Sequence, residues 1–278
     1  MIPSRKFAAV LVAAMACATS AALYVRAQAQ GQTANPAQTL PPAALQMNRN
    51  AVVLDPAHGG QDAGATLGDK ILEKDVTLAF AARLRATLTA AGFTVVSTRE
   101  ADSTTPPIND QRAEIANRAH AVACIVLHAT ASGSGVHLYT SALQPQEEDA
   151  IASIPLTPRS AFVPVSWDRA QAAFVSQSLR LVSDLSAALG KASLPAFSRR
   201  EPVRPLDNLE CPAVALELAP LAVAGSDATP VTDADYQQRV AATLTTALQA
   251  WREHATPAAP ANSPNGSGDN PVQTGGTP

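Results

Sequence analysis

The chain is poor in aromatic residues and in cysteine, and it carries no large excess of either charge. Aromatic side chains make up 4% of the sequence although 46% of it is hydrophobic, so we expect a core of small aliphatic side chains. The net charge of −3 argues against a nucleic-acid partner, because neutralising phosphates requires a basic surface. The cysteines form no CxxC pair and no zinc-ribbon spacing, which excludes the common cysteine-based zinc sites.

The N-terminal segment has the pattern of an export signal. Arg5 and Lys6 precede an uncharged apolar run over residues 7–25, and Ala27-Gln28-Ala29 offers small residues for cleavage. The apolar run is long for a signal peptide, so a membrane anchor over residues 1–29 stays an alternative. In both cases we expect an exported protein of the periplasm or cell envelope.

Cys124 and Cys211 are the two cysteines that lie beyond this segment. An exported protein can carry a disulfide. Both residues, however, lie in or beside apolar runs, which is also typical of buried free cysteines. We therefore expect two buried, unpaired cysteines on separate strands.

Composition divides the rest of the chain into three parts. Residues 30–49 are rich in Gln, Ala, Pro and Thr and are expected to form a flexible spacer. Residues 255–278 are rich in Pro, Gly, Ser, Asn and Thr and are expected to form a disordered tail. The folded domain is therefore predicted to span residues 50–254.

Within that domain, short apolar runs alternate with amphipathic segments. The runs predict strands at residues 51–54, 93–98, 123–127, 136–140 and 213–216. The amphipathic segments predict helices at residues 75–91, 110–121, 168–189 and 233–251, with Asn109 and Thr232 as N-caps of the second and the fourth. Continuous apolar strands between helices are typical of an α/β fold, so we expect a single domain with a mostly parallel twisted sheet flanked by helices on both faces.

Polar residues able to bind a metal lie at the ends of several apolar runs. His58, His128 and Glu217 each lie at or just past the end of a predicted strand, and Glu73 lies at the start of a predicted helix. Ligands bind outside the carboxyl ends of strands in such sheets. Two histidines and a carboxylate are the ligands of many catalytic zinc sites, and a second carboxylate can serve as base.

Each of these residues also has a structural explanation when it is taken alone. A carboxylate at a helix start, such as Glu73, is favoured by the helix dipole. His137 alternates with apolar neighbours, so we expect it on the outer face of a strand. Arg199, Arg200 and Arg204 are expected in a solvated loop, with contact between Arg204 and a substrate carboxylate as the alternative.

Taken in order, these segments resemble the zinc-dependent N-acetylmuramoyl-L-alanine amidases, the cell-wall amidase family often called amidase type 3. The similarity covers most of the predicted domain and rests on six segments: LDPAHGG at 54–60 with Asp62 and Gly64-Ala65, EKD at 73–75, Thr98-Arg99 with Asp102, Arg112 with Ala116-Asn117, VLHA at 126–129, and PAVALE at 212–217.

The resemblance implies one zinc ion bound by His58, Glu73 and His128, with Glu217 as the general base. It implies hydrolysis of the amide between N-acetylmuramic acid and L-alanine in peptidoglycan or a muropeptide. A protein activator is left open. Two other interpretations also stay open: a non-catalytic peptidoglycan-binding protein that keeps the fold, and a zinc amidase that acts on soluble muropeptides.

The sequence departs from the family pattern at three places around these residues. Ala57 stands where the family usually has glycine, and alanine would cost about 1 kcal/mol if that position required a positive φ. Thr130 replaces a common asparagine, and residues 218–221 replace the usual Gly-Phe and Ser-Asn. We expect these changes to alter the lining of the cleft and to leave the metal ligands in place.

Overall fold

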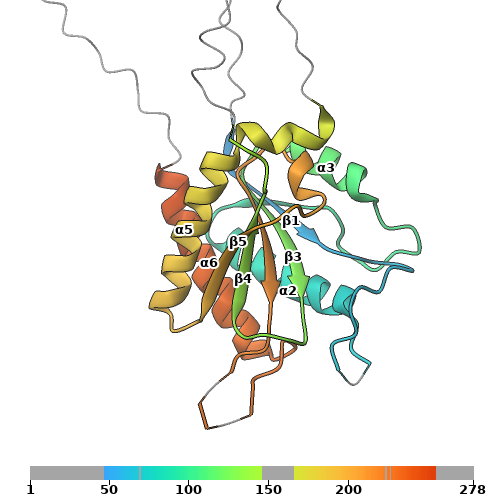
Figure 1. Ribbon diagram of the computed structural model, residues 1–278, viewed down its shortest axis with the longest axis vertical. Coiled ribbons are helices and arrows are strands. Elements are labelled where there is room, and N and C mark those ends of the chain that lie inside the picture. The colour runs from blue at the N-terminus through green and yellow to red at the C-terminus, as the bar shows by residue number, and fades with distance from the viewer. Residues whose placement is uncertain (1–46, 69, 146–165, 223, 226, 255–278) are drawn as a thin grey trace, which may run out of the picture. The chain divides into compact units, whose positions relative to one another are not determined.

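The computed structural model describes residues 47–254, apart from 69, 146–165, 223 and 226 (Figure 1). The predicted signal or anchor over 1–29, most of the predicted spacer and the predicted tail over 255–278 lie outside the described residues. The spacer was predicted too long, because its last two residues, Asn48 and Arg49, already belong to the first strand. None of the helices in the described part of the chain combines the length and the hydrophobicity that a membrane span requires.

Strands and helices alternate along the described chain. The strands are β1 (Asn48–Pro56), β2 (Thr94–Ser97), β3 (Ala121–Ala129), β4 (Val136–Thr140), β5 (Ala196–Arg200) and β6 (Ala213–Leu218). The α-helices are α2 (Glu73–Ala90), α3 (Asn109–Arg118), α5 (Val175–Lys191) and α6 (Ala234–His254), and two short 3₁₀ helices are η1 (Trp167–Ala173) and η2 (Leu206–Asn208). The helix predicted at 168–189 is thus divided at Phe174 into η1 and α5.

Two predicted N-caps were wrong by one residue. Asn109 is the first residue of α3, and the backbone N–H of Ile108 before it donates to the Gln111 side chain at 3.1 Å. At α6, Asp233 rather than Thr232 accepts a hydrogen bond from the backbone N–H of Tyr236, at 2.7 Å. Both side chains satisfy backbone groups that a helix leaves free at its first turn.

The strands form one sheet in the order β2-β1-β3-β6-β4-β5. All neighbouring pairs are parallel except β4 and β6, which are antiparallel. This confirms the predicted α/β fold with a mostly parallel sheet. The order also inserts β6 between β3 and β4, two strands that follow each other directly in the sequence.

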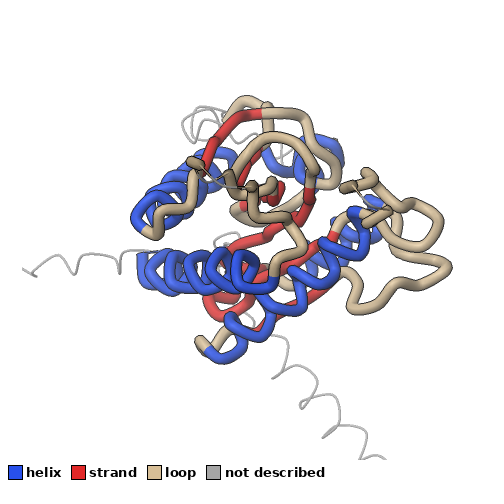
Figure 2. Tube along the Cα trace, turned by 90° about the horizontal axis from the view of Figure 1, so that it is seen from below, coloured by secondary structure: helices blue, strands red, loops and turns tan. Residues whose placement is uncertain are grey.

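The two faces of the sheet are covered unequally. Alternate residues of β1 and β3, such as Leu54 and Leu127, pack in a large cluster with the apolar sides of α2, α5 and α6. The residues between them, such as Val53 and Val126, pack in a smaller cluster with α3 and η2. Helices therefore flank both faces, as predicted, and the core consists mostly of Ala, Val and Leu. The two views show the helices outside the strands (Figures 1 and 2).

The edge strand β5 was not predicted. Its residues have no apolar alternation, and most of them are exposed, including Phe197 at 57% of its surface. An edge strand lies at the margin of the sheet, where solvent can reach the side chains on both faces, so it can be polar on both. Arg199 and Arg200 therefore lie in a strand, and the prediction that placed them in a loop was wrong.

Cys124 and Cys211 form a disulfide, so the prediction of two unpaired cysteines was wrong. Cys124 lies in β3, and Cys211 lies just before β6, its neighbour in the sheet. Their Cα atoms are 6.2 Å apart, within the range of disulfides. The bond depends on the order of the strands, which the sequence alone did not give.

Candidate active site

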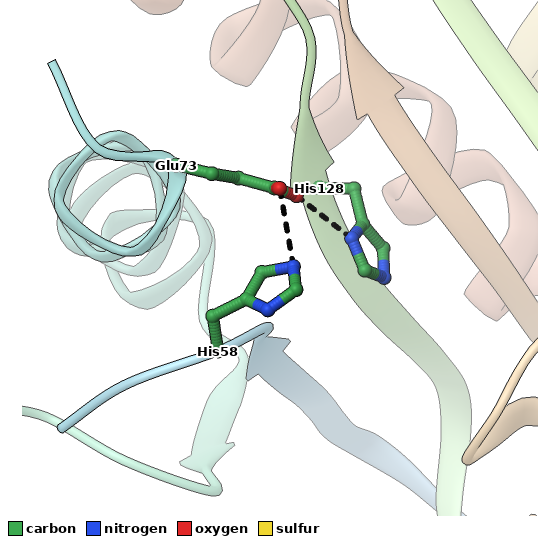
Figure 3. A group of neighbouring side chains, drawn as sticks. All are labelled: His58, Glu73 and His128. Atoms are coloured by element: carbon green, nitrogen blue, oxygen red, sulfur yellow. Dashed lines mark hydrogen bonds and ion pairs between the residues drawn. The ribbon is translucent and has the colours of Figure 1, made fainter. Parts of the chain in front are cut away.

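His58, Glu73 and His128 come together at one end of the sheet. His58 follows β1, Glu73 is the first residue of α2, and His128 is near the end of β3. Glu73 lies between the two rings, with its oxygens 3.1 Å from His58 Nε2 and 2.9 Å from His128 Nδ1 (Figure 3). One ligand atom from each residue lies within 4.8 Å of the others, so the three side chains could hold a metal ion.

The Glu73 carboxylate is the most buried member of the group. It is 5% exposed, and its oxygens also accept hydrogen bonds from the backbone N–H groups of Ala65 at 2.9 Å and Ala129 at 3.2 Å. Burial raises the pKa of this carboxyl, but the hydrogen bonds with His128, His58 and Ala65 lower it by more, so the net pKa lies well below the usual range. Glu73 is therefore held as a carboxylate, the form that binds metals.

The backbone and a second carboxylate orient the His58 ring. His58 itself has a positive φ of 64°, whereas Ala57 does not. The strain that a positive φ would have caused at Ala57 is thus absent, because the left-handed residue is the next one along. The Nδ1 atom of His58 donates to Asp62 Oδ2 at 2.9 Å, which leaves Nε2 facing Glu73. The hydrogen bond with Glu73 is the main cause that raises the pKa of His58.

Gly64 allows the close approach of these side chains. A Cβ atom at this position would lie 2.7 Å from both Glu73 Oε2 and His58 Cδ2, and the residue has a φ of +65°. Any side chain here would push two candidate ligands apart, which explains the glycine at position 64.

Two buried arginines fix the segment that carries His58. Arg112 donates to the carbonyl oxygens of Pro56 at 2.8 Å and His58 at 2.7 Å. Arg99 donates to those of Pro56 at 2.8 Å and Ala57 at 3.0 Å. Arg112 also forms a buried ion pair with Asp55 at 2.6 Å. These arginines, found in the sequence only as parts of motifs, hold the main chain on which the first histidine lies.

A third set of contacts holds the turn at Gly60, which follows His58. Lys74 donates to Asp102 at 2.6 Å and to the carbonyl of Gly60 at 2.8 Å. Asp102 in turn accepts the backbone N–H of Gly60 at 2.6 Å. The start of α2, the loop after β2 and the turn after His58 are thereby joined, so the motif positions next to Glu73 have a structural role.

A cavity of about 370 Å³ opens beside the histidines. His58, His128 and Arg204 line it, together with residues of the segment before α3, including Pro107 and the exposed Ile108. Arg204 is exposed, as expected for a solvated loop, but it faces the same cavity as two candidate metal ligands. A guanidinium there could contact an anionic group of a bound molecule.

Glu217 lies next to His128 but outside the lining of that cavity. The two residues are paired in register on the parallel strands β3 and β6, so their side chains lie on the same face of the sheet. Oε2 of Glu217 accepts hydrogen bonds from His137 Nδ1 and from the Tyr139 hydroxyl, both at 3.0 Å. His137 does lie away from the large cluster, but it contacts Glu217 rather than facing only solvent. Sequence reasoning missed this contact because it depends on β6 pairing with β4.

Comparison with known proteins places the chain in a family. The N-acetylmuramoyl-L-alanine amidase family matches residues 52–250. The chain belongs to this family of hydrolases. Among curated proteins, the germination-specific N-acetylmuramoyl-L-alanine amidase of Bacillus subtilis (strain 168) is 47% identical over 66 residues, which are 24% of this chain and 27% of that protein. The aligned segment thus spans about a quarter of the length of this relative.

Solved amidase structures share the fold. The catalytic domain of CwlV from Bacillus (Paenibacillus) polymyxa var. colistinus matches with a TM-score of 0.52 and 23% identity, over 73% of this chain and 98% of that one. The amidase Ami1 of Mycobacterium smegmatis matches with a TM-score of 0.54 and 18% identity, over 73% and 97%. At these identities the similarity establishes the amidase fold, and it agrees with the family assignment.

Proposed function

We propose that this chain is a zinc-dependent amidase that cleaves peptidoglycan between the lactyl group of N-acetylmuramic acid and the L-alanine of the stem peptide. The observation that carries the proposal is the cluster of His58, Glu73 and His128, whose ligand atoms lie within 4.8 Å of one another at the strand ends of an amidase fold. Family membership supplies the substrate class, and the site supplies the chemistry.

The donor set fits zinc. Two imidazoles and one carboxylate are ligands that zinc accepts, and three protein ligands leave one coordination position free. Asp62 holds the outer nitrogen of His58, as carboxylates commonly do behind metal-binding histidines. When bound, zinc supplies Lewis acidity, which lowers the pKa of water and polarises a carbonyl group.

Glu217 is proposed as the general base. It lies beside His128 in register, on the same face of the sheet and at its carboxyl edge. Its carboxylate would accept a proton from the attacking water and return that proton to the nitrogen of the leaving L-alanine. Arg204, which lines a cavity together with His58 and His128, would contact a carboxylate of the stem peptide.

The disulfide supports the export predicted from the N-terminal segment. Disulfides persist in secreted and periplasmic proteins and are rare in the reducing cytosol. Cys124 and Cys211 would therefore pair in the compartment where peptidoglycan lies. We propose a location in the periplasm or cell envelope on this basis.

Product analysis tests the function. The zinc-loaded full chain is incubated with purified peptidoglycan and with soluble muropeptides, beside the Glu217→Gln variant, and the products are identified by mass spectrometry. We expect stem peptides with a free N-terminal alanine, and a rate about 10²- to 10⁴-fold lower for the variant at equal zinc content. Full activity in Glu217→Gln would contradict the role of the base.

The same experiment separates the two alternative interpretations. Cleavage of soluble muropeptides with no release from intact walls would identify an enzyme that acts on wall fragments. Binding to walls without release of peptide, with zinc bound, would identify a non-catalytic binding protein and would overturn the proposed activity.

A further inference from the structure

The Glu217 carboxylate is held through one of its two oxygens. His137 Nδ1 and the Tyr139 hydroxyl both contact Oε2, each at 3.0 Å. Among the residues that the structure describes, Oε1 takes part in no hydrogen bond or ion pair. The two oxygens are therefore chemically distinct: one is fixed by two donors, and the other is free to accept a proton.

The sheet brings these donors to Glu217. His137 lies directly opposite Glu217 in the antiparallel pairing of β4 with β6, and Tyr139 follows two residues later on the same face. Side chains opposite each other, or diagonal to each other, on neighbouring strands are within contact distance. The contact is therefore built into regular sheet geometry and involves no loop.

The His137 ring is itself confined on several sides. The Phe197 ring on β5 meets it edge-on with centroids 5.7 Å apart, and the Tyr139 ring does so at 6.5 Å. A Cβ atom on Gly133 would lie 2.9 Å from His137 Cε1, so the main chain there also runs close to the ring. Packing on these sides fixes the direction in which Nδ1 donates.

We propose that His137, together with Tyr139, is a positioning residue that fixes the Glu217 carboxylate so that Oε1 receives the proton of the attacking water. This inference rests on the proposed function. The proton passes from water to Oε1 and then from Oε1 to the amide nitrogen of the leaving alanine, while His137 and Tyr139 keep their own protons. Half-buried Glu217 would otherwise rotate about its side-chain bonds, and misplacing a reacting group is costly in rate.

Tyr139 is suited to a permanent donor role. Burial and the neighbouring Glu217 raise the pKa of Tyr139 to about 12, so its hydroxyl keeps its proton at neutral pH. Glu217 thus has one donor whose state does not change near neutrality and a second, His137, whose ring is held by packing.

Two amide variants of His137 distinguish the loss of the hydrogen-bond donor from the loss of the imidazole ring. In His137→Asn the amide nitrogen is as many bonds from Cα as Nδ1 is, so it can still donate to Oε2. In His137→Gln the amide lies one carbon further, near the position of Nε2, and the Nδ1 donor is lost. Tyr139→Phe removes the second donor and deletes only one oxygen atom.

The test measures kcat, KM and zinc content on peptidoglycan fragments for the full chain, these three variants and the His137→Gln/Tyr139→Phe double variant. We expect His137→Gln to lower kcat by roughly ten- to a hundred-fold with nearly unchanged KM and zinc content. His137→Asn should keep most of the activity, Tyr139→Phe should lose part of it, and the double variant should approach Glu217→Gln.

Three outcomes would overturn the inference. One is wild-type kcat in His137→Gln while Glu217→Gln is inactive, which leaves the proposed function intact. Another is an equal loss in His137→Asn and His137→Gln, which would mean that the Nδ1 donor is not what matters. An inactive wild-type chain with zinc bound would overturn the proposed function and this inference with it. If His137→Gln fails to fold, the test rests on His137→Asn and Tyr139→Phe. Wild-type kcat in Tyr139→Phe would then contradict the proposal that both donors position Oε2 of Glu217.

Discussion

The half of the site that carries His58, Glu73 and His128 differs from the half that carries Glu217 in how many contacts fix it. We call these the ligand half and the base half. In the ligand half, Arg99 and Arg112 hold successive carbonyl groups of the main chain, and Lys74 and Asp102 hold the following turn. In the base half, two side-chain donors hold one oxygen of Glu217.

The comparison separates two kinds of constraint. The ligand half is fixed through its backbone by buried charges, so single losses there should disturb the metal site as a whole. In the base half the sheet fixes the main chain of β6, and two side-chain donors orient the Glu217 carboxylate, so single side-chain losses there should change the rate and leave the metal in place. The following predictions test this division, from the largest expected effect to the smallest.

Removing a candidate ligand should have the largest effect. In His58→Ala we expect zinc affinity to fall by more than about 100-fold, since even losses behind a ligand cost 10–100-fold. Peptide release should fall to background together with it. Metal content after dialysis and release of peptide are measured side by side with Glu217→Gln, which should keep its zinc. Equal zinc retention in both variants would remove the distinction between the halves.

The disulfide joins the two halves, because β3 carries His128 and the segment before β6 leads to Glu217. The bond closes a long loop, with 87 positions separating the cysteines, so its loss should lower the free energy of unfolding by about 2–5 kcal/mol. Urea unfolding of the Cys124→Ala/Cys211→Ala double variant, with reduced wild-type chain as a control, measures this. We expect activity at 25 °C to persist, and an unchanged urea midpoint would contradict the prediction.

Gly64 sharpens the comparison within the ligand half. In Gly64→Ala the new methyl group would collide with Glu73 and His58, so zinc affinity should drop by about 10–100-fold. Gly68→Ala is the matched control, since Gly68 has a similar φ of +72° but no atom within 4 Å of an added Cβ. Both variants carry the same backbone strain. A metal-binding loss of the same size in both would show that strain, and not the collision, is responsible.

Arg204 should give the smallest effect. It is exposed, and replacing it with alanine removes one contact to an anionic substrate group, which is worth about a few-fold to ten-fold in KM. Arg180→Ala, an exposed arginine on α5, is the control and should leave KM unchanged. Kinetics on muropeptides with and without a free carboxylate would show whether this carboxylate contacts Arg204. An equal KM for both muropeptides in the wild-type chain would exclude that contact.

Much of the ligand half could be predicted from the sequence because its residues lie in short motifs. His58 and His128 follow apolar runs, and Glu73 begins a helix with clear periodicity, so parallel strands bring them to one edge of the sheet. The sequence did not indicate which residue of this segment has the positive φ. It is His58 rather than Ala57, in a segment whose carbonyl groups are held by Arg99 and Arg112 from distant parts of the chain.

The base half was harder to predict because it depends on the order of the strands. Glu217 itself follows an apolar run, but its contact with His137 requires β6 to lie beside β4 and antiparallel to it. The same insertion of β6 brings Cys211 next to Cys124. Strand β5, which carries Phe197, lacks the alternation that marks a half-buried strand. Pairing partners are tertiary information, and no local pattern in these segments specifies them.

The position of β6 also has a consequence for incomplete chains. Of the six strands of the sheet, β6 comes last in the sequence, yet it occupies the gap between β3 and β4. A nascent chain that ends before β6 would carry all three candidate ligands but not Glu217, and its sheet would be open between β3 and β4. A product that ends before residue 213 would therefore lack both the proposed general base and the strand that joins β3 to β4.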